Sequence, residues 1–319
     1  MHSGGSLSES KHALALAREK NAIVGDRGPA LYSTVGVHPT RCSEFEENDF
    51  DLDADAYYAE LERVCLDGKQ DGTVRGRYPT NSPYLDSNIL ICERQIVAIG
   101  ECGLDYDRLE FCSKELQRKY FERQFALAES TRLPMFLHNR NTDGDFYEMI
   151  ATHRARFTYG VVHSFTGSTD EALKLVELGL AIPTDKLMIE TGAWLAILCE
   201  ILGCVAHGAH NNNTFLSDAP WCDIRATHAG FQHVQTTWPT KKAEKHDDAS
   251  LVKGRNEPCT LRYVAVRPWK PIRHADCIPL SCSQVLEVVS AVRGQDQYEL
   301  AACVLENTRR VFFPLEEAS

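Results

Sequence analysis

The segment QIVAIG at residues 95–100, followed immediately by Glu101, indicates the fold of this chain more clearly than any other. It is a short, β-rich apolar run that ends at a carboxylate. Three further runs share this form and end before a histidine: 31–37 before His38, 133–137 before His138, and 160–162 before His163. Short apolar runs of this kind are typical of parallel strands, which are buried on both faces.

Helical patterns lie between these predicted strands. After Ser113, a suitable helix N-cap, apolar residues recur at helical spacing over residues 116–128. A second helical pattern begins near Asp170. One helix between two successive parallel strands is the strand–helix–strand crossover. The alternation therefore predicts an α/β fold, and reactive residues at the strand ends favour a TIM-like (β/α) barrel.

The composition excludes several classes of protein. A hydrophobic content of 43% argues against a disordered chain, and no apolar run is long enough to span a bilayer. A net charge of −11 disfavours a broad basic surface for nucleic acid, but it permits phosphate chemistry wherever bound cations supply positive charge. Twelve scattered cysteines and an amino terminus without an apolar signal core favour an intracellular protein, cytoplasmic or nuclear.

Glu101, His138 and His163 form a candidate metal site. One carboxylate and two imidazoles on three separate strand ends can converge on a single point above a barrel, and these groups are common ligands of divalent metal ions. Any one of the three alone would be interpreted as an ordinary polar residue at the end of a strand. Because all three terminate apolar runs, together they predict a metal site.

Longer motifs around these residues resemble the TatD family of metal-dependent deoxyribonucleases. The motifs occur in the order of the family: VGVHPT (35–40), GECGLDY (100–106), PMFLHNR (134–140), VVHSF (161–165), KLMIET (186–191) and DAPWC (218–222). The eukaryotic branch of the family is matched further by THAG (227–230), PTKK (239–242) and RNEPC (255–259). The resemblance covers most of the chain.

This resemblance implies a TIM-like barrel that binds divalent ions at the carboxyl ends of its strands and hydrolyses the phosphodiester bonds of DNA, as an exonuclease or an endonuclease. Glu101 then matches a bridging carboxylate with a catalytic role, and His138 and His163 match histidine ligands. Asp218 matches an aspartate that both binds metal and helps to activate the attacking water. The expected cofactor is Mg²⁺, with Mn²⁺ or Zn²⁺ as alternatives.

The resemblance also implies residues that contact the substrate. His38 matches a histidine expected to face DNA, and the guanidinium of Arg140 suits a scissile phosphate. A simple ion pair between Arg140 and a neighbouring carboxylate is an equal alternative. DNA is the expected partner; the sequence indicates no membrane and identifies no protein partner.

The sequence departs from the family pattern in three respects. No His-x-His pair of a first strand is present, one strand–helix unit is missing after Leu180, and 26 residues separate Thr191 from Asp218. We therefore expect one barrel domain over residues 1–319 that is incomplete. Irregular stretches interrupt it at about 66–94, 192–217 and 261–282, and we interpret them as intron-like insertions or errors in the gene model.

Two other functions remain open from the sequence. An amidohydrolase-type metal enzyme would act on a C–N or ester bond, but such sites usually need the His-x-His pair and often a bridging lysine, and no lysine directly follows a matching apolar run. A catalytically inactive remnant of the barrel would instead act as a binding protein. A nuclease assay with Mg²⁺ or Mn²⁺ distinguishes these alternatives.

Overall fold

The structure is a computed structural model of the whole chain. It describes residues 3–24, 31–70, 74–78, 89–92, 94–163, 165–182, 226, 229–235, 239–245, 251–252 and 280–313. The chain divides into two compact units, one formed by residues 1–182 and 308–319 and the other by residues 183–307. The single barrel domain expected over residues 1–319 stays a prediction.

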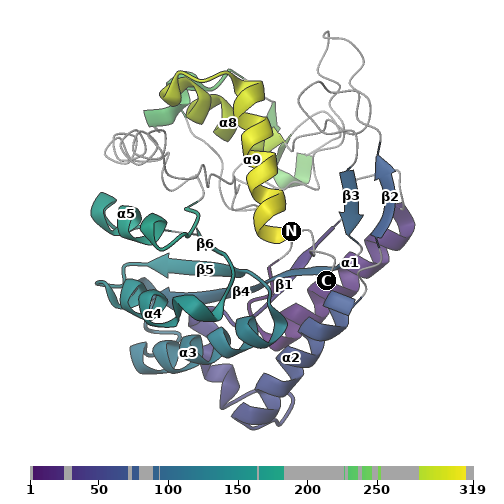
Figure 1. Ribbon diagram of the computed structural model, residues 1–319, viewed down its shortest axis with the longest axis vertical. Coiled ribbons are helices and arrows are strands. Elements are labelled where there is room, and N and C mark those ends of the chain that lie inside the picture. Colours follow the sequence, from purple (N-terminus) through teal and green to yellow (C-terminus); the bar gives the residue numbers. More distant parts are fainter. Residues whose placement is uncertain are drawn as a thin grey trace. The chain divides into compact units, whose positions relative to one another are not determined.

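A four-stranded parallel sheet forms the centre of the first unit (Figure 1). Its strands, in spatial order, are β1 (Ser33–Val35), β4 (Ile96–Asp105), β5 (Met135–Arg140) and β6 (Gly160–His163). Gly103 of β4 lies opposite His138 of β5, which in turn lies opposite His163 of β6. Each of the four strands overlaps one of the four apolar runs, so the prediction of a parallel α/β fold is confirmed.

Helices connect the strands, and α2, α3 and α4 lie along one side of the sheet in Figure 1. The helices of this unit are α1 (Leu7–Val24), α2 (Ala54–Gln70), α3 (Lys114–Thr131), α4 (Asp145–His153) and α5 (Thr169–Glu177), with short 3₁₀ turns η2 (Pro39–Phe45), η3 (Tyr106–Arg108) and η4 (Arg154–Arg156). Helix α3 begins where the sequence predicts, because the Ser113 side chain accepts a hydrogen bond from the Leu116 amide.

Helix α3 buries an aromatic face against the sheet. Tyr120 stacks on Phe45 of η2 with ring centroids 4.3 Å apart, and Phe121 contacts Phe125 at 4.6 Å. All four rings are fully buried. Aromatic burial of this extent contributes several kcal/mol of apolar transfer energy, and it holds α3 against η2 and β4.

Two sequence expectations differ from the structure in extent. Strand β4 does not end at Glu101 but continues to Asp105, because Cys102 and Leu104 prolong the buried apolar pattern. The stretch 66–94, for which the sequence predicts no regular structure, is regular in its described parts: its first five residues complete α2, and β2 (Val74–Tyr78) pairs antiparallel with β3 (Ile89–Cys92). Its glycine-rich, charged composition conceals this pair in the sequence.

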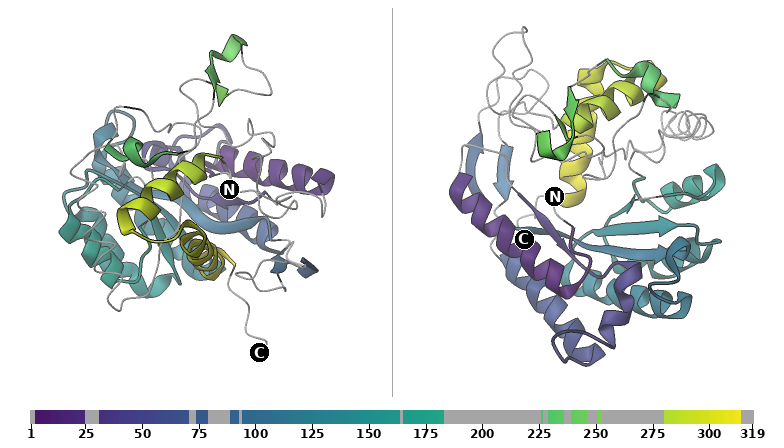
Figure 2. Two further views of the ribbon diagram at one scale, coloured as in Figure 1. Left: turned by 90° about the horizontal axis from the view of Figure 1, so that it is seen from above. Right: turned by 180° about the vertical axis from the view of Figure 1, so that it is seen from behind.

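The second unit is described in separate pieces. They are η5 (Ala229–His233), β7 (Thr240–Lys241), η6 (Ala243–Lys245), β8 (Leu251–Val252), α8 (Leu280–Arg293) and most of α9 (Gln297–Phe312), which continues into the first unit. Both views of Figure 2 show α9 following α8 after a short turn. The Gln235 amide donates to Glu287 of α8 at 2.7 Å.

The remaining expected insertions fall largely outside the described residues. The whole of 192–217 does so, and of 261–282 only the last three residues are described, where they belong to α8. The missing first strand and the missing strand–helix unit stay predictions. Within the described parts of the chain, no helix combines the length and the apolar character needed to cross a membrane.

Candidate metal centre

Three neighbouring strands bring the three predicted ligands together. Glu101 lies in β4, His138 in β5 and His163 at the last position of β6. Their side chains are only 15%, 6% and 6% exposed. Because parallel strands run in the same direction, residues near their carboxyl ends meet at one edge of the sheet.

The distances between the three side chains suit a divalent cation. His138 Nδ1 lies 2.8 Å from Glu101 Oε1, and His163 Nε2 lies 3.5 Å from the same oxygen. Ligands held about 2.1 Å from a metal ion are separated from one another by about 3.0–3.4 Å in octahedral or tetrahedral arrangements. One carboxylate oxygen and two imidazole nitrogens therefore form a donor set of suitable size and chemistry.

The charges within this cluster favour an ionised carboxylate. Burial alone would raise the pKa of Glu101, but the hydrogen bond with His138 and the field of His163 outweigh it and hold that pKa well below its usual range. Burial would likewise lower the pKa of His138, yet its hydrogen bonds to Asp105 and Glu101 raise it. The site thus keeps negative charge where a cation would bind.

His38 approaches the same carboxylate from the segment after β1. It is the N-cap of η2, where its Nδ1 accepts a hydrogen bond from the Thr40 amide at 3.2 Å. A backbone amide can only donate, so the proton of the neutral ring is on Nε2, which lies 3.6 Å from Glu101 Oε1. Burial and the neighbouring His138 lower the pKa of His38 to about 4. The His38 ring is therefore neutral, with Nε2 as its hydrogen-bond donor.

Two buried glutamines of α3 fix the backbone on which the site depends. Gln124 accepts from the Val37 amide at 2.8 Å and donates to the Val37 carbonyl at 3.1 Å, directly before His38. Gln117 makes the same pair of bonds to Asp105, at 2.8 Å and 2.9 Å. These glutamines lie seven residues apart and so share one helix face. Sequence reasoning did not identify them, because polar residues on a buried helix face reveal their partners only in the fold.

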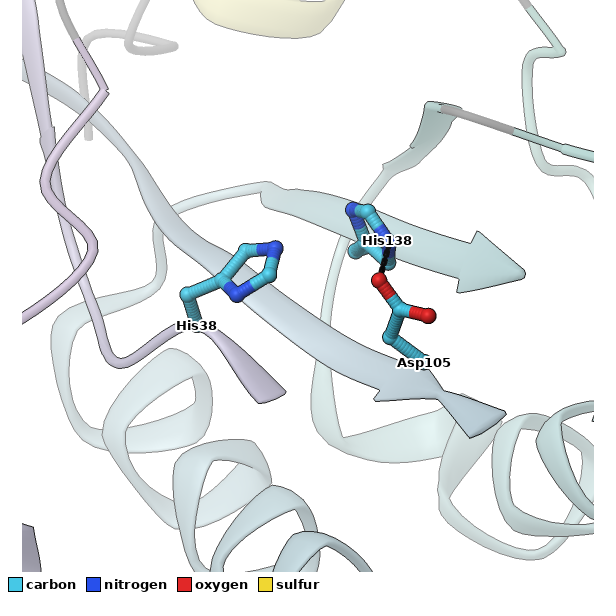
Figure 3. Close-up of side chains that lie close together, drawn as sticks. All are labelled: His38, Asp105 and His138. Carbon is cyan, nitrogen blue, oxygen red and sulfur yellow. Dashed lines mark hydrogen bonds and ion pairs between the residues drawn. The ribbon is translucent and has the colours of Figure 1, made fainter. Parts of the chain in front are cut away.

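Asp105 is a further residue of the site that sequence reasoning missed. Its side chain is fully buried at the end of β4, and its Oδ2 lies 3.1 Å from His138 Nε2, as Figure 3 shows. The sequence does contain a signal for it: Asp105 lies four residues after Glu101, and an even spacing along a strand places two side chains on the same face.

The other predicted site residues are Arg140, which the structure describes, and Asp218, which it does not. Arg140, the last residue of β5, pairs with Asp107 through its Nε at 2.9 Å, so the alternative of a simple ion pair describes its state in this structure. Its contact with DNA stays a prediction. Asp218 lies outside the described residues, and its predicted roles as a metal ligand and a catalytic group stay predictions as well.

Comparison with protein families identifies relatives over nearly the whole chain. A family model described as "TatD related DNase" matches residues 2–313. Deoxyribonuclease Tat-D of Schizosaccharomyces pombe is 32% identical over 268 residues, which are 83% of this chain and 73% of that protein. A protein of Musicola paradisiaca named 3'-5' ssDNA/RNA exonuclease TatD is 25% identical and is matched over 97% of this chain and 84% of its own.

Solved structures show the same fold. A TatD family hydrolase from Entamoeba histolytica matches 98% of this chain and 84% of its own with a TM-score of 0.73, at 23% identity. An uncharacterized amidohydrolase from Saccharomyces cerevisiae matches 97% of this chain and 87% of its own, with a TM-score of 0.68 and 26% identity. These matches confirm the TIM-barrel hydrolase fold that the motifs predict.

Proposed function

Because the chain belongs to the TatD-related DNase family, we propose that it is a metal-dependent deoxyribonuclease whose cation is held by Glu101, His138 and His163. One observation carries the assignment to these residues: a carboxylate oxygen and two imidazole nitrogens from three adjacent strands lie within 4.8 Å of one another. The relatives named as deoxyribonucleases and as an ssDNA/RNA exonuclease support DNA as the substrate. Mg²⁺ is the proposed ion, with Mn²⁺ and Zn²⁺ as alternatives.

Hydrolysis of a phosphodiester bond requires a nucleophile and a means of offsetting negative charge on phosphorus-bound oxygens. A divalent cation supplies both, by acidifying water and by polarising the phosphoryl group. The chain's own part is to keep Glu101 ionised and the two histidines aligned in a partly dry site, where electrostatic interactions are stronger than in water.

His38 has a separate role in this proposal. Its Nε2–H points toward the cluster and can donate to a non-bridging phosphate oxygen. The other ring nitrogen, Nδ1, already accepts a hydrogen bond from the Thr40 amide. Arg140 can add a second contact to the phosphate if its ion pair with Asp107 is replaced by one with the DNA backbone. Asp218 is the proposed acceptor of the proton that leaves the attacking water.

A nuclease assay on the full chain tests the proposed function. Single-stranded and duplex DNA labelled at one end, and RNA of the same sequence, are incubated with Mg²⁺ or Mn²⁺ and with EDTA. We expect cation-dependent cleavage that EDTA abolishes. Glu101→Gln should lower kcat about 100-fold or more, because the cation that stabilises transition-state charge would lose its carboxylate ligand.

Glu129→Gln is the matched control. This exposed glutamate of α3 pairs with Arg156 at 2.7 Å on the outer surface, so its substitution makes the same chemical change away from the site. We expect wild-type activity from it. A chain that binds DNA but cleaves none of the substrates with either cation would support the binding-protein alternative instead.

A further inference from the structure

The buried carboxylate of Asp105 has no part in the cation site proposed above, yet it contacts one of its ligands. Asp105 reaches His138 from the end of β4 (Figure 3), with Oδ2 3.1 Å from Nε2. Its other oxygen accepts a hydrogen bond from the Asp107 amide at 3.2 Å and so caps η3. A fully buried carboxylate is costly to desolvate, so its retention here requires strong partners.

The position of Asp105 is held from below by α3. Gln117 bonds to both the amide and the carbonyl of Asp105, and its side-chain nitrogen also donates to the Cys112 carbonyl at 3.0 Å. The backbone of Asp105 is therefore tied to α3 by hydrogen bonds to its amide and its carbonyl. A carboxylate supported in this way can orient a neighbouring histidine ligand within the narrow geometric tolerance of a metal site.

The two nitrogens of His138 face different partners. Nδ1 faces Glu101 at 2.8 Å and belongs to the donor set with His163, whereas Nε2 faces Asp105. A neutral imidazole that gives one nitrogen to a cation carries its proton on the other. If Nδ1 binds the cation, the proton is therefore on Nε2, where the carboxylate of Asp105 accepts it.

A second cation held by His38, Asp105 and His138 is the competing interpretation, because their ligand atoms are also close together. Two features oppose it. The Thr40 amide occupies Nδ1 of His38 and leaves the proton on Nε2, the nitrogen that would have to bind. In addition, both donor sets contain His138, and a neutral ring cannot give both nitrogens to cations.

We propose that Asp105 is a positioning residue, not a metal ligand: it accepts the Nε2–H of His138 and thereby directs Nδ1 toward the cation shared with Glu101 and His163. This inference rests on the proposed cation site. It assigns the His38–Asp105–His138 cluster to orientation and substrate contact, and it leaves a single cation position among the described residues. Outer carboxylates that orient a histidine ligand typically change metal affinity by about 10- to 100-fold.

The test uses the full chain with Zn²⁺ alone as a diamagnetic probe. Calorimetry gives the Kd for Zn²⁺, and ¹⁵N-histidine NMR of the Zn²⁺-loaded protein reports which nitrogen of His138 carries a proton. We expect a protonated Nε2 in the wild type. Asp105→Ala should raise the Kd about 10- to 100-fold and make this proton exchange rapidly with water.

Asp105→Asn separates positioning from a purely structural role. Asparagine caps a helix turn as well as aspartate does and can still accept the Nε2–H, but it lacks the charge. We expect the Nε2 proton to be retained, its resonance to move upfield, and the rise in Kd to be smaller than for alanine. This variant also gives a result if Asp105→Ala fails to fold. Asp107→Asn, in the same turn, is the control and should change neither readout.

Three outcomes would overturn the inference. They are a proton on Nδ1 of His138 in the loaded wild type, an unchanged Kd and Nε2 signal in Asp105→Ala, and two Zn²⁺ ions bound with one lost on that substitution. A wild type that binds no Zn²⁺ would overturn both the inference and the proposed cation site. The expected Zn²⁺ and NMR results without any nuclease activity would refute the proposed function alone.

Discussion

Replacing Gly103 by alanine should force β4 and β5 apart and so disturb the site without touching any of its side chains. Gly103 lies opposite His138 in the sheet and has a φ of +147°, which residues with a side chain rarely adopt. A Cβ added there would lie 2.0 Å from the carbonyl oxygen of His138, and 2.9 Å from its carbonyl carbon. The obstacle is backbone, so no side-chain rotation can relieve it.

The magnitude follows from these distances. The strands must separate by about 1.4 Å before the new carbon, 2.0 Å from the carbonyl oxygen, reaches the 3.4 Å of an ordinary contact, and this overpacking costs about 1–3 kcal/mol. The unfavourable φ adds about 1–3 kcal/mol. We therefore expect the free energy of unfolding to fall by about 4 kcal/mol. A displacement of about 1 Å at His138 should also lower nuclease activity about 100-fold.

Gly144→Ala is the matched control for this prediction. Gly144 also has a positive φ, +86°, but a Cβ built there meets no atom within 4 Å. The free energy of unfolding of this variant should fall by only about 1–2 kcal/mol, the cost of the unfavourable φ, and its nuclease activity should be unchanged. Both variants are measured by urea unfolding with the m-value checked for constancy. A Gly103→Ala protein no less stable than Gly144→Ala would refute the reasoning.

Three further predictions concern the core, pH and the cation. Phe125→Ala removes a fully buried ring of α3 and should cost about 3–5 kcal/mol in urea unfolding; a cost below 1 kcal/mol would contradict the described packing. Salt bridges to Lys114 and Arg118 outweigh burial and lower the pKa of Asp145 to about 2, so its stabilisation is complete above about pH 4 and is lost as pH falls toward 2. Screening limits this to about 1 kcal/mol, and Asp145→Asn should remove that part of the acid slope. Calorimetric titration with Mn²⁺ should reveal one tight site, since both candidate donor sets among the described residues contain His138; two tight, independent sites would be inconsistent with this.

The sequence predicts the sheet and the candidate ligands well because both depend on local pattern. A buried parallel strand requires a continuous apolar run, and the polar residue that follows it marks the strand's carboxyl end. Glu101, His138 and His163 could therefore be expected on one edge from spacing alone. The extent of β4 could not, because Glu101 interrupts the apolar pattern that resumes at Cys102.

Residues that act through other residues are harder to predict. Gln117 and Gln124 look like surface positions of an amphipathic helix, and only the fold shows that each closes a pair of backbone hydrogen bonds. The proton position on His38 depends on the Thr40 amide, which is a matter of turn geometry. Asp105 was within a recognised motif, but its partner lies 33 residues away on the next strand.

The order of the strands also governs when the site can form on the ribosome. All four strands and the three donors lie between residues 33 and 163, and each donor after Glu101 arrives with the strand that pairs with the previous one. At about 5–20 residues per second, the interval from Glu101 to His163 takes roughly 3–12 s of synthesis. A nascent chain thus completes the described donor set before most of the second unit has been translated. A cation that binds at this stage of synthesis binds only a chain whose strands are already paired. By mass action it therefore shifts the folding equilibrium of the nascent chain from the unfolded state toward the paired sheet.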